Sequence, residues 1–438
     1  MAAAVGGVGE GQARAPRAGR RAPRRPALTG RARTVKGESV VGTELVVEVG
    51  AVAHGGVCVA RHEGRAVFVR HTLPGERVRI RVTEGGTEDR FWRADAVAVL
   101  TPSPARVEPP CPWSGPGRCG GCDWQHVLLP AQRSLKAAVV SEQLKRLAGL
   151  DVAVTVEPVV GDVDGLDWRT RVTYAVDAGG RAGLRQHRSH EVVPIDFCRI
   201  AHPEVRAARV EDGQWPGAET VEVVAANTGE RQVIVDGEIV EGRAHVAEEA
   251  AGRTWRVSGG GFWQVHPGAA NTLVNAVLDG VSARPGERAM DLYCGVGLFA
   301  GALADVVGPT GSVFGVEGSR QAVADARRNL HDVPWVRLAT GRVDRVLSSA
   351  GPAGVPDAAD IVVLDPPREG AKSAVVRRIV ARRPRVVAYV ACDPAALARD
   401  LATFAGHGYR LTSLRAFDLF PMTHHVECVA IVEPDRPS

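Results

Sequence analysis

The strongest hydrophobic pattern in the chain lies between residues 386 and 400, which read VVAYVACDPAALARD. Four of the first six residues are Val or Tyr, and a short run of this kind predicts a buried strand. Asp393 and Pro394 follow at once and predict a helix start, because Asp is a favoured N-cap and Pro is favoured at the first helical position. Cys392 is therefore predicted where a strand ends and a helix begins.

Two interpretations of Cys392 are compatible with this pattern. A thiol beside a helix N-terminus lies close to backbone N–H groups and to the positive end of the helix dipole. We would then expect its pKa to fall below about 8.5 and its thiolate to act as a nucleophile. The other interpretation is a small buried core residue, which is a common position for a free Cys.

Three other apolar runs in the second half of the chain predict further strands of an α/β domain. Since ligands in open α/β sheets bind at the carboxyl ends of strands, the polar residues that end these runs are expected to converge with Cys392. The runs are residues 289–293, containing Asp291 and followed by the loop Cys294 to Gly297; residues 313–316, followed by Glu317; and residues 361–364, followed by Asp365.

The last apolar run, residues 426–432, carries Glu427 at its start. This Glu is either an exposed edge residue, which is the usual position for Glu, or a base that points into the cleft.

Residues 42–100 alternate apolar and polar positions, most strictly from Arg77 to Val82. Gly-Gly and Pro-Gly pairs supply turns, so short strands and a small β-barrel are predicted. Arg77, Arg79 and Arg81 should share one face, which either follows a phosphate backbone or is simply solvated.

The middle of the chain predicts one helix followed by a mixed α+β region. The helix spans residues 127–150, with Leu135, Val139, Leu144 and Leu147 on the apolar stripe and Lys136, Glu142, Lys145 and Arg146 outside. From residue 151 to about 260, short strands alternate with turns. Arginines, among them Arg169 and Arg171, are mixed with aromatic residues there, which suits unstacked RNA bases and equally a scaffold with solvated arginines.

Four cysteines form a candidate metal site. Cys111, Cys119 and Cys122 lie in a Pro/Gly-rich loop, and Cys198 lies much further along the chain. Thiolates select soft metals, which means zinc or an iron–sulfur cluster. Structural zinc sites usually use two close Cys pairs, whereas this chain has one, so the spacing leaves both metals open.

Composition and charge narrow the classes of protein. A chain of 438 residues predicts two to three domains, and the lack of a run of 18 apolar residues predicts no membrane span. Eight cysteines without a framework of close pairs and without an export signal predict a reducing, cytoplasmic location. Residues 1–36 carry a net charge of +8 within a total of +4. This low-complexity tail is either an RNA-contacting arm or a passive disordered leader.

The motifs DLYCGVG, LDPPREG, CDPAALARD and HVECV occur in the order and approximate spacing of the bacterial RNA uridine-C5-methyltransferase family, which this chain resembles. The segment GFWQVHPGA, residues 261–269, resembles the family's motif before the domain that binds S-adenosylmethionine (SAM). Residues 56–82 resemble a TRAM domain, a small RNA-binding barrel. The four cysteines resemble the [4Fe–4S] site of family members with this barrel.

The resemblance implies a multidomain organisation. It consists of a disordered basic tail (residues 1–36), a TRAM-like barrel (37–100), a central α+β domain with an iron–sulfur and RNA-binding role (101–262) and a class I SAM-dependent methyltransferase domain with a Rossmann-like α/β fold (263–438).

The resemblance also implies residue roles. Cys392 is the nucleophile and Glu427 the base. SAM or the target base is held by Gln264, Tyr293, Glu317 and Asp365, and a [4Fe–4S] cluster, with zinc as the alternative, is held by Cys111, Cys119, Cys122 and Cys198. The family usually has Asn where His266 stands, and its adenine-contacting acidic residue is either Asp344 or absent.

The implied product is 5-methyluridine. Family members that act on tRNA generally lack the barrel and the cysteines, so 23S ribosomal RNA is the expected partner and tRNA the alternative. A catalytically silent RNA-binding or folding protein is the alternative of a different class. A DNA cytosine methyltransferase is disfavoured, because its nucleophile normally follows Pro and Cys392 follows Ala391. A monomer without membrane association is expected.

Overall fold

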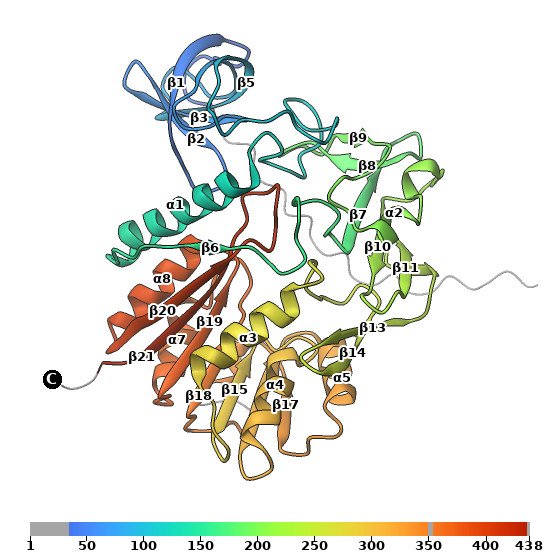
Figure 1. The fold of residues 1–438 in the computed structure, drawn as a ribbon, viewed down its shortest axis with the longest axis vertical. Coiled ribbons are helices and arrows are strands. Elements are labelled where there is room, and N and C mark those ends of the chain that lie inside the picture. The colour runs from blue at the N-terminus through green and yellow to red at the C-terminus, as the bar shows by residue number, and fades with distance from the viewer. Residues whose placement is uncertain (1–34, 349–353, 436–438) are drawn as a thin grey trace, which may run out of the picture.

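The computed structural model describes residues 35–348 and 354–435, so nearly all of the predicted basic tail lies outside the described residues. Figure 1 shows three regions: a small barrel, a second sheet beside it, and a larger sheet flanked by helices. The predictions of a barrel, a central region of short strands and a C-terminal α/β sheet are confirmed.

The N-terminal region is a closed barrel of strand order β1-β2-β3-β5-β4. Its alternating pattern sorts as predicted: along β4, Val78, Ile80 and Val82 are buried and the three intervening arginines are exposed. Two of these arginines, Arg79 and Arg81, pair with Glu44 on the neighbouring strand. The strands are β1 Glu44–Val52, β2 Cys58–His62, β3 Arg65–Arg70, β4 Arg77–Glu84 and β5 Phe91–Thr101.

The central region is a six-stranded antiparallel sheet of order β12-β11-β10-β7-β8-β9, with a separate hairpin of β13 and β14. Arg171, predicted in a cluster of RNA-facing or solvated arginines, is buried beside Glu248. The elements are β7 Arg171–Val176, β8 Ala182–Arg185, β9 Val192–Pro194, α2 Pro203–Arg206, η1 Val210–Asp212, β10 Thr220–Ala225, β11 Arg231–Val235, β12 Glu238–Glu241, β13 His245–Ala250 and β14 Arg253–Ser258.

The C-terminal region is an eight-stranded sheet of order β17-β16-β15-β18-β19-β21-β20-β6. The strands from β17 to β19 are parallel, and β21 runs antiparallel to both of its neighbours. The strands are β6 Val156–Glu157, β15 Arg288–Leu292, β16 Ser312–Glu317, β17 Val336–Thr340, β18 Ile361–Leu364, β19 Val386–Ala391, β20 Tyr409–Phe417 and β21 Glu427–Pro434. The helices are α1 Leu129–Ala148, α3 Ala269–Val281, α4 Leu298–Val307, α5 Arg320–Asn329, α6 Val343–Val346, α7 Lys372–Val380 and α8 Pro394–Ala405.

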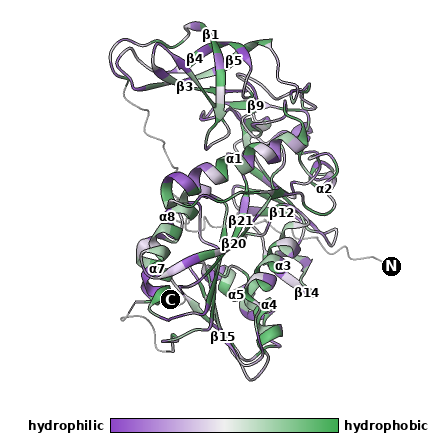
Figure 2. Ribbon diagram, turned by 60° about the vertical axis from the view of Figure 1, so that its left-hand side comes forward, coloured by the Kyte–Doolittle hydropathy of each residue, from purple (hydrophilic) through white to green (hydrophobic). Residues whose placement is uncertain are grey.

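Helices cover both faces of this sheet, which is why its central strands are apolar at every position. Alternate residues enter two cores: one is shared with α3 and α4, and the other with α1, α7 and α8. Figure 2 shows hydrophilic and hydrophobic patches alternating along α1 and α8, as expected for helices with one buried face. In the described part of the chain, no helix is long and apolar enough to cross a bilayer.

One part of this sheet comes from far upstream in the sequence. Helix α1 packs on α8, and the two-residue strand β6 pairs in parallel with β20 at the sheet edge. Figure 1 shows α1 between the barrel and α8. The predicted helix is confirmed, and its position links the barrel to the C-terminal sheet.

One predicted surface residue of this helix is in fact buried. Lys136 has no exposed side-chain surface, and its Nζ lies 2.5 Å from Oδ1 of the equally buried Asp418. The amine also donates to the carbonyl of Phe420 at 3.0 Å. The outward prediction for Lys136 was wrong because a helical pattern does not reveal a partner carboxylate that arrives from another segment.

Replacing Lys136 by Met should destabilise the fold by about 3–5 kcal/mol, because it leaves the Asp418 carboxylate buried and uncompensated. The matched control is Lys145→Met on the same helix, whose exposed pair with Asp151 should contribute less than about 1 kcal/mol. Urea unfolding of both variants measures the difference. Equal losses of unfolding free energy in the two variants would show that the buried pair stabilises the fold no more than the exposed pair does.

Candidate active site

Cys392 lies directly after β19 and before α8, as predicted. Asp393 is the N-cap, and its Oδ1 accepts a hydrogen bond from the amide of Ala396 at 2.7 Å. The half-buried Cys392 lines a cavity of about 150 Å³. The other lining residues are His54, Gly55, Gly56, Val139, Arg368, Asp393, Pro394, His424, His425 and Val426.

Glu427 is brought beside Cys392 by strand pairing. In the antiparallel ladder of β19 and β21, Ala391 is opposite Cys428, so the residue after Ala391 and the residue before Cys428 meet at the same edge. Glu427 is 4% exposed, which excludes the interpretation as an exposed edge residue. Burial raises the pKa of the Cys392 thiol, and the charge of Glu427 raises it further.

Asp365 and Arg368, at the end of β18, complete this charged group. Burial raises the pKa of Asp365. Burial, followed by the nearby charge of Asp365, raises the pKa of Glu427 well above its usual value, while Arg368 acts in the opposite direction. Arg368 also lies 3.3 Å from Nε2 of His425. Two carboxyl groups that both resist ionisation therefore lie next to the thiol.

The expectation that the helix N-terminus lowers the pKa of Cys392 was wrong. In the free protein its pKa is raised to about 12, first by burial and then by the charges of Glu427 and Asp365. Arg368 offsets only part of this effect. A pattern of strand, Cys and N-cap locates the thiol, but the carboxylates that oppose its ionisation come from two other strands.

The neighbouring strand ends form the edge expected to hold SAM. Glu317 accepts hydrogen bonds from the amides of Gly295 and Ser319, at 3.1 and 2.7 Å, which fixes its carboxylate beside the glycine loop. Gly297 has a φ of 99°, and a Cβ there would lie 2.8 Å from the side chain of Leu330. The loop therefore requires glycine at this position.

Asp291 has a structural position in the same loop. Its Oδ2 accepts from the amide of Ala300 in the first turn of α4, whose N-cap is a glycine without a capping side chain. Burial raises its pKa to about 8, and its Oδ1 is buried without a hydrogen-bond partner. The charges of Asp365 and Glu317 also act on Asp291, so the predicted convergence of these strand ends is confirmed.

The remaining predicted residues lie around this edge. Burial, followed by the charge of Asp344, raises the pKa of Tyr293 to about 12, so Tyr293 and Asp344 are close together. Gln264 is half-buried in the loop between β14 and α3. His266, where the family usually has Asn, is buried and stacks on Trp168 with ring centroids 5.9 Å apart.

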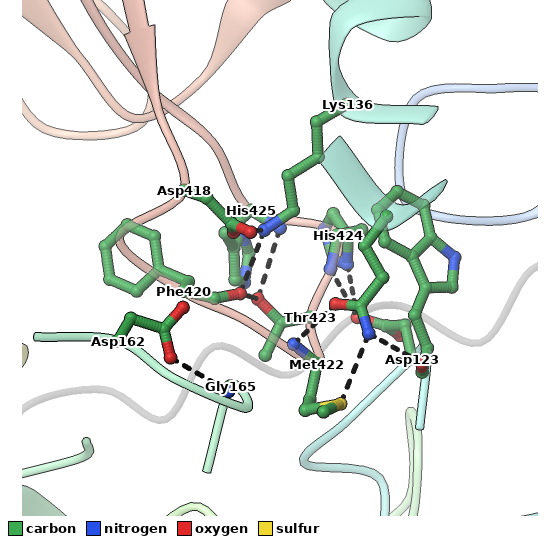
Figure 3. A network of polar contacts seen from close by, with 12 residues as sticks. Asp123, Lys136, Asp162, Gly165, Asp418, Phe420, Met422, Thr423, His424 and His425 are labelled. Atoms are coloured by element: carbon green, nitrogen blue, oxygen red, sulfur yellow. Dashed lines mark hydrogen bonds and ion pairs between the residues drawn. The ribbon is translucent and has the colours of Figure 1, made fainter. Parts of the chain in front are cut away.

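The segment 418–426, which leads into Glu427, is fixed by residues from the cysteine loop and α1 (Figure 3). The carbonyl of Met422 accepts hydrogen bonds from the amides of Asp123 and Trp124, both at 3.0 Å. Gln132 of α1 accepts from the amide of Met422 at 2.8 Å. Asp123 also lies 2.6 Å from Nδ1 of His424. Hydrogen bonds from the cysteine loop and from α1 therefore hold this segment in place.

The four predicted metal ligands lie within electrostatic range of one another, and Cys122 directly precedes Asp123. Burial is the largest cause that raises the pKa values of Cys119, Cys122 and Cys198. The charge of Cys111 also raises each of these three pKa values. The charge of Arg169 lowers the pKa of Cys119 and of Cys198. Among the described residues, no three His, Cys, Asp or Glu side chains are grouped closely enough to hold one metal ion.

Three residues of the site were not assigned a role from the sequence. Arg368 was quoted within the motif LDPPREG, and His425 within HVECV, without a function. Asp400 lies in α8 and accepts hydrogen bonds from the Tyr389 hydroxyl at 2.7 Å and the Ala371 amide at 2.8 Å, which ties the end of the LDPPREG loop to α8. All three residues lie within motifs that the sequence analysis identified, but only the fold shows which residues they contact.

A larger cavity, of about 550 Å³, lies between β7, β8 and residues 216–219. None of the predicted site residues lines it, whereas Cys392 lines the smaller cavity.

Comparisons with known proteins agree with this geometry. Residues 38–97 match the sequence profile of the TRAM domain. Residues 356–434 match that of tRNA (uracil-5-)-methyltransferase, and residues 267–360 match that of protein-L-isoaspartate (D-aspartate) O-methyltransferase.

Relatives of similar length extend the likeness to the whole chain. An uncharacterised RNA methyltransferase of Streptomyces avermitilis is 53% identical over 432 residues, covering 90% of this chain and 99% of its own. One of Streptomyces coelicolor is 54% identical over 434 residues, covering 90% and 94%. The crystal structure of Pyrococcus abyssi tRNA (uracil-54, C5)-methyltransferase with S-adenosyl-L-homocysteine has a similar fold, with a TM-score of 0.65, 23% identity and coverage of 88% of this chain and 100% of its own.

The raised pKa of Cys392 predicts how fast the free protein reacts with iodoacetamide. Because only the thiolate reacts, labelling of Cys392 should accelerate about tenfold per pH unit from about pH 7 to about pH 10. Glu427→Gln removes a carboxyl group whose charge, once it ionises, opposes ionisation of the thiol, so it should speed labelling at the high end of this pH range. Peptide mass spectrometry follows the reaction. A rate that levels off below about pH 9 would contradict the raised pKa.

Proposed function

Because the chain belongs to the RNA uracil-C5 methyltransferase family and is a SAM-dependent RNA methyltransferase, we propose that it forms 5-methyluridine in 23S ribosomal RNA with Cys392 as nucleophile and Glu427 as base. One observation carries the residue assignment: the pairing of β19 with β21 brings the thiol of Cys392, which lines the cavity, and the buried carboxyl group of Glu427 to neighbouring positions at one edge of the sheet. Nucleophilic addition and proton removal at one ring need these two groups side by side.

The chemistry follows from the weakness of uracil C5 as a nucleophile. Cys392 reacts as the thiolate: its sulfur forms a bond to C6, the C5–C6 double bond opens, and C5 becomes an enolate carbon. Bound SAM would supply the electrophilic methyl group, so that C5 bonds to the methyl carbon while the methyl–sulfur bond breaks and S-adenosyl-L-homocysteine leaves. Glu427 then removes the C5 proton, the double bond re-forms, and the bond between C6 and the Cys392 sulfur breaks. The uridine must leave its RNA stack to reach this cavity.

The raised pKa of Glu427 suits its proposed role as base. A buried carboxylate with a raised pKa binds a proton strongly, as a base at carbon requires. Arg368 lowers the pKa of both Cys392 and Glu427, so it favours the ionised forms that addition and proton removal use.

SAM, the methyl donor, is assigned to the glycine loop and the residues around it. Glu317, fixed by two backbone amides, is suited to the ribose hydroxyls of SAM, and the nearby Tyr293 and Asp344 are suited to its adenosine end. Gln264 and Asp365 are assigned to the cofactor or to the edge of the uracil.

Cys111, Cys119, Cys122 and Cys198 are assigned to a [4Fe–4S] cluster. Four thiolates around one zinc would lie about 4 Å apart, and no such compact group occurs among the described residues. Burial, followed by the charges of other members of the set, raises the pKa of Cys119 and of Cys122, and thiols at this wider spacing fit a cluster, whose ligands are spread more widely. The reaction needs no electron, so the cluster has a structural or RNA-orienting role.

Two RNA classes compete as substrates. The barrel and the cysteines favour 23S ribosomal RNA. The archaeal enzyme with the similar fold is named for uracil 54 of tRNA and aligns over its whole length, which makes tRNA the second candidate. We also propose domain limits at residues 36, 100 and 262. The protein is proposed to be a monomer and to be located in the cytoplasm.

Glu427→Gln should accumulate a denaturation-resistant protein–RNA adduct, because the proton that releases Cys392 is no longer removed. The matched control is Cys392→Ala, which should form no adduct and transfer no methyl group while binding SAM with little change. Denaturing gels with labelled RNA separate the outcomes. Normal turnover by Glu427→Gln would remove the base assignment, and methyl transfer by Cys392→Ala would remove the nucleophile assignment.

Protein purified without oxygen should be brown and contain iron and sulfide, and Cys122→Ser should lose the colour. Cys58→Ser is the control, since Cys58 lies in the barrel core and is not part of the set. Absorbance and metal analysis measure the result. A colourless protein that contains zinc would contradict the cluster assignment.

Mapping of 5-methyluridine should identify the RNA. A strain without the gene should lose the modification from 23S ribosomal RNA, and the purified enzyme should restore it there. Loss from tRNA alone would contradict the 23S assignment and support the second candidate.

A further inference from the structure

The β-barrel supplies one wall of the cavity over Cys392. His54, Gly55 and Gly56 lie in the loop between β1 and β2 and line the cavity opposite residues from the C-terminal sheet. The barrel residues are far from Cys392 in sequence: His54 and Asp393 are 339 positions apart. The barrel is therefore part of the reaction site as well as a separate RNA-binding unit.

One direct contact joins this loop to the turn that carries the nucleophile. Nε2 of His54 lies 3.1 Å from Oδ2 of Asp393, while Oδ1 of Asp393 accepts from the Ala396 amide. Burial opposes ionisation of Asp393, but the hydrogen bonds from His54 and Ala396 outweigh it, and its pKa is lowered. Each carboxylate oxygen thus has a separate partner, one in the helix and one in the barrel.

The loop is held against the site by close packing. The carbonyl of Gly56 accepts from Nε1 of Trp124 at 3.0 Å. A Cβ at Gly56 would lie 2.5 Å from the Cβ of His424, so only glycine allows this approach. The loop is also closed on itself by hydrogen bonds between Ala53 and Val57 and between Gly56 and Ala53. These contacts hold His54, which directly precedes Gly55, against Asp393.

We propose that His54 is a positioning residue for the methyl-transfer reaction, and that it acts by fixing Asp393 and hence the orientation of the Cys392 turn. Asp393 directly follows Cys392 in the same turn, so loss of the contact that fixes Asp393 lets the backbone of this turn shift and displaces the sulfur. Displacement of a reacting group by about 1 Å is enough to slow a reaction by about two orders of magnitude. The role rests on the proposed function, because the step that His54 assists is the attack of Cys392.

Variants of the full-length protein separate positioning from RNA binding. His54→Ala should lower the single-turnover rate at saturating RNA and SAM by about 10- to 100-fold, with RNA affinity changed less than about threefold. His54→Gln, which retains a donor, should recover most of the rate. Asp393→Asn keeps a good N-cap and loses the charge, and combined with His54→Ala it should be no slower than His54→Ala alone.

The control is His62→Ala, a barrel histidine that packs beside Trp92 and does not line the cavity. A loss confined to RNA affinity in His54→Ala, or a double variant whose losses multiply, would overturn the proposal. Failure of the wild-type protein to methylate uridine would instead overturn the proposed function.

A second measurement needs no RNA. N-ethylmaleimide should label Cys392 faster in His54→Ala than in the wild type or His62→Ala, because the wall over the thiol is opened. Equal labelling rates in the three proteins would show that His54 does not close the cavity, whatever the enzyme's substrate.

Discussion

The site depends on one strand pairing. Strand β21 enters the sheet antiparallel between β19 and β20, with Ala391 opposite Cys428. Because a strand begins where its antiparallel partner ends, this register brings Glu427 and Cys392 together. A shift by one residue would turn Glu427 to the other face of the sheet and separate its carboxyl group from the Cys392 thiol. The parallel strands beside them add Asp365, Glu317 and the glycine loop at the same edge.

The surroundings of this pairing come from the rest of the chain. The segment before Glu427 is held by Asp123 and Trp124, which follow Cys122, and by the buried pair of Lys136 with Asp418. The barrel loop closes the cavity from the other side. The same burial raises the pKa of the acids at this edge and of the Cys392 thiol.

The sequence predicted the features that depend on local pattern. Alternation identified the barrel, apolar runs identified β15, β16, β18 and β19, and an Asp-Pro pair located the start of α8. Features that depend on distant partners were missed or wrong. Lys136 is buried because Asp418 meets it, Cys392 has a raised pKa because two other strands carry acids, and β6 completes a sheet whose other strands lie more than a hundred residues downstream. None of these partners can be read from the residues around each position.

The central claim is that Cys392 forms a covalent bond to C6 of the target uridine. Replacing the target by 5-fluorouridine in a substrate RNA tests it directly, because fluorine at C5 cannot be removed as a proton and the adduct cannot resolve. After incubation with SAM and nuclease digestion, mass spectrometry should find a methylated fluorouridine nucleotide on the peptide that contains Cys392. An adduct on a different residue, or no adduct from an enzyme that methylates the unmodified RNA, would contradict the account.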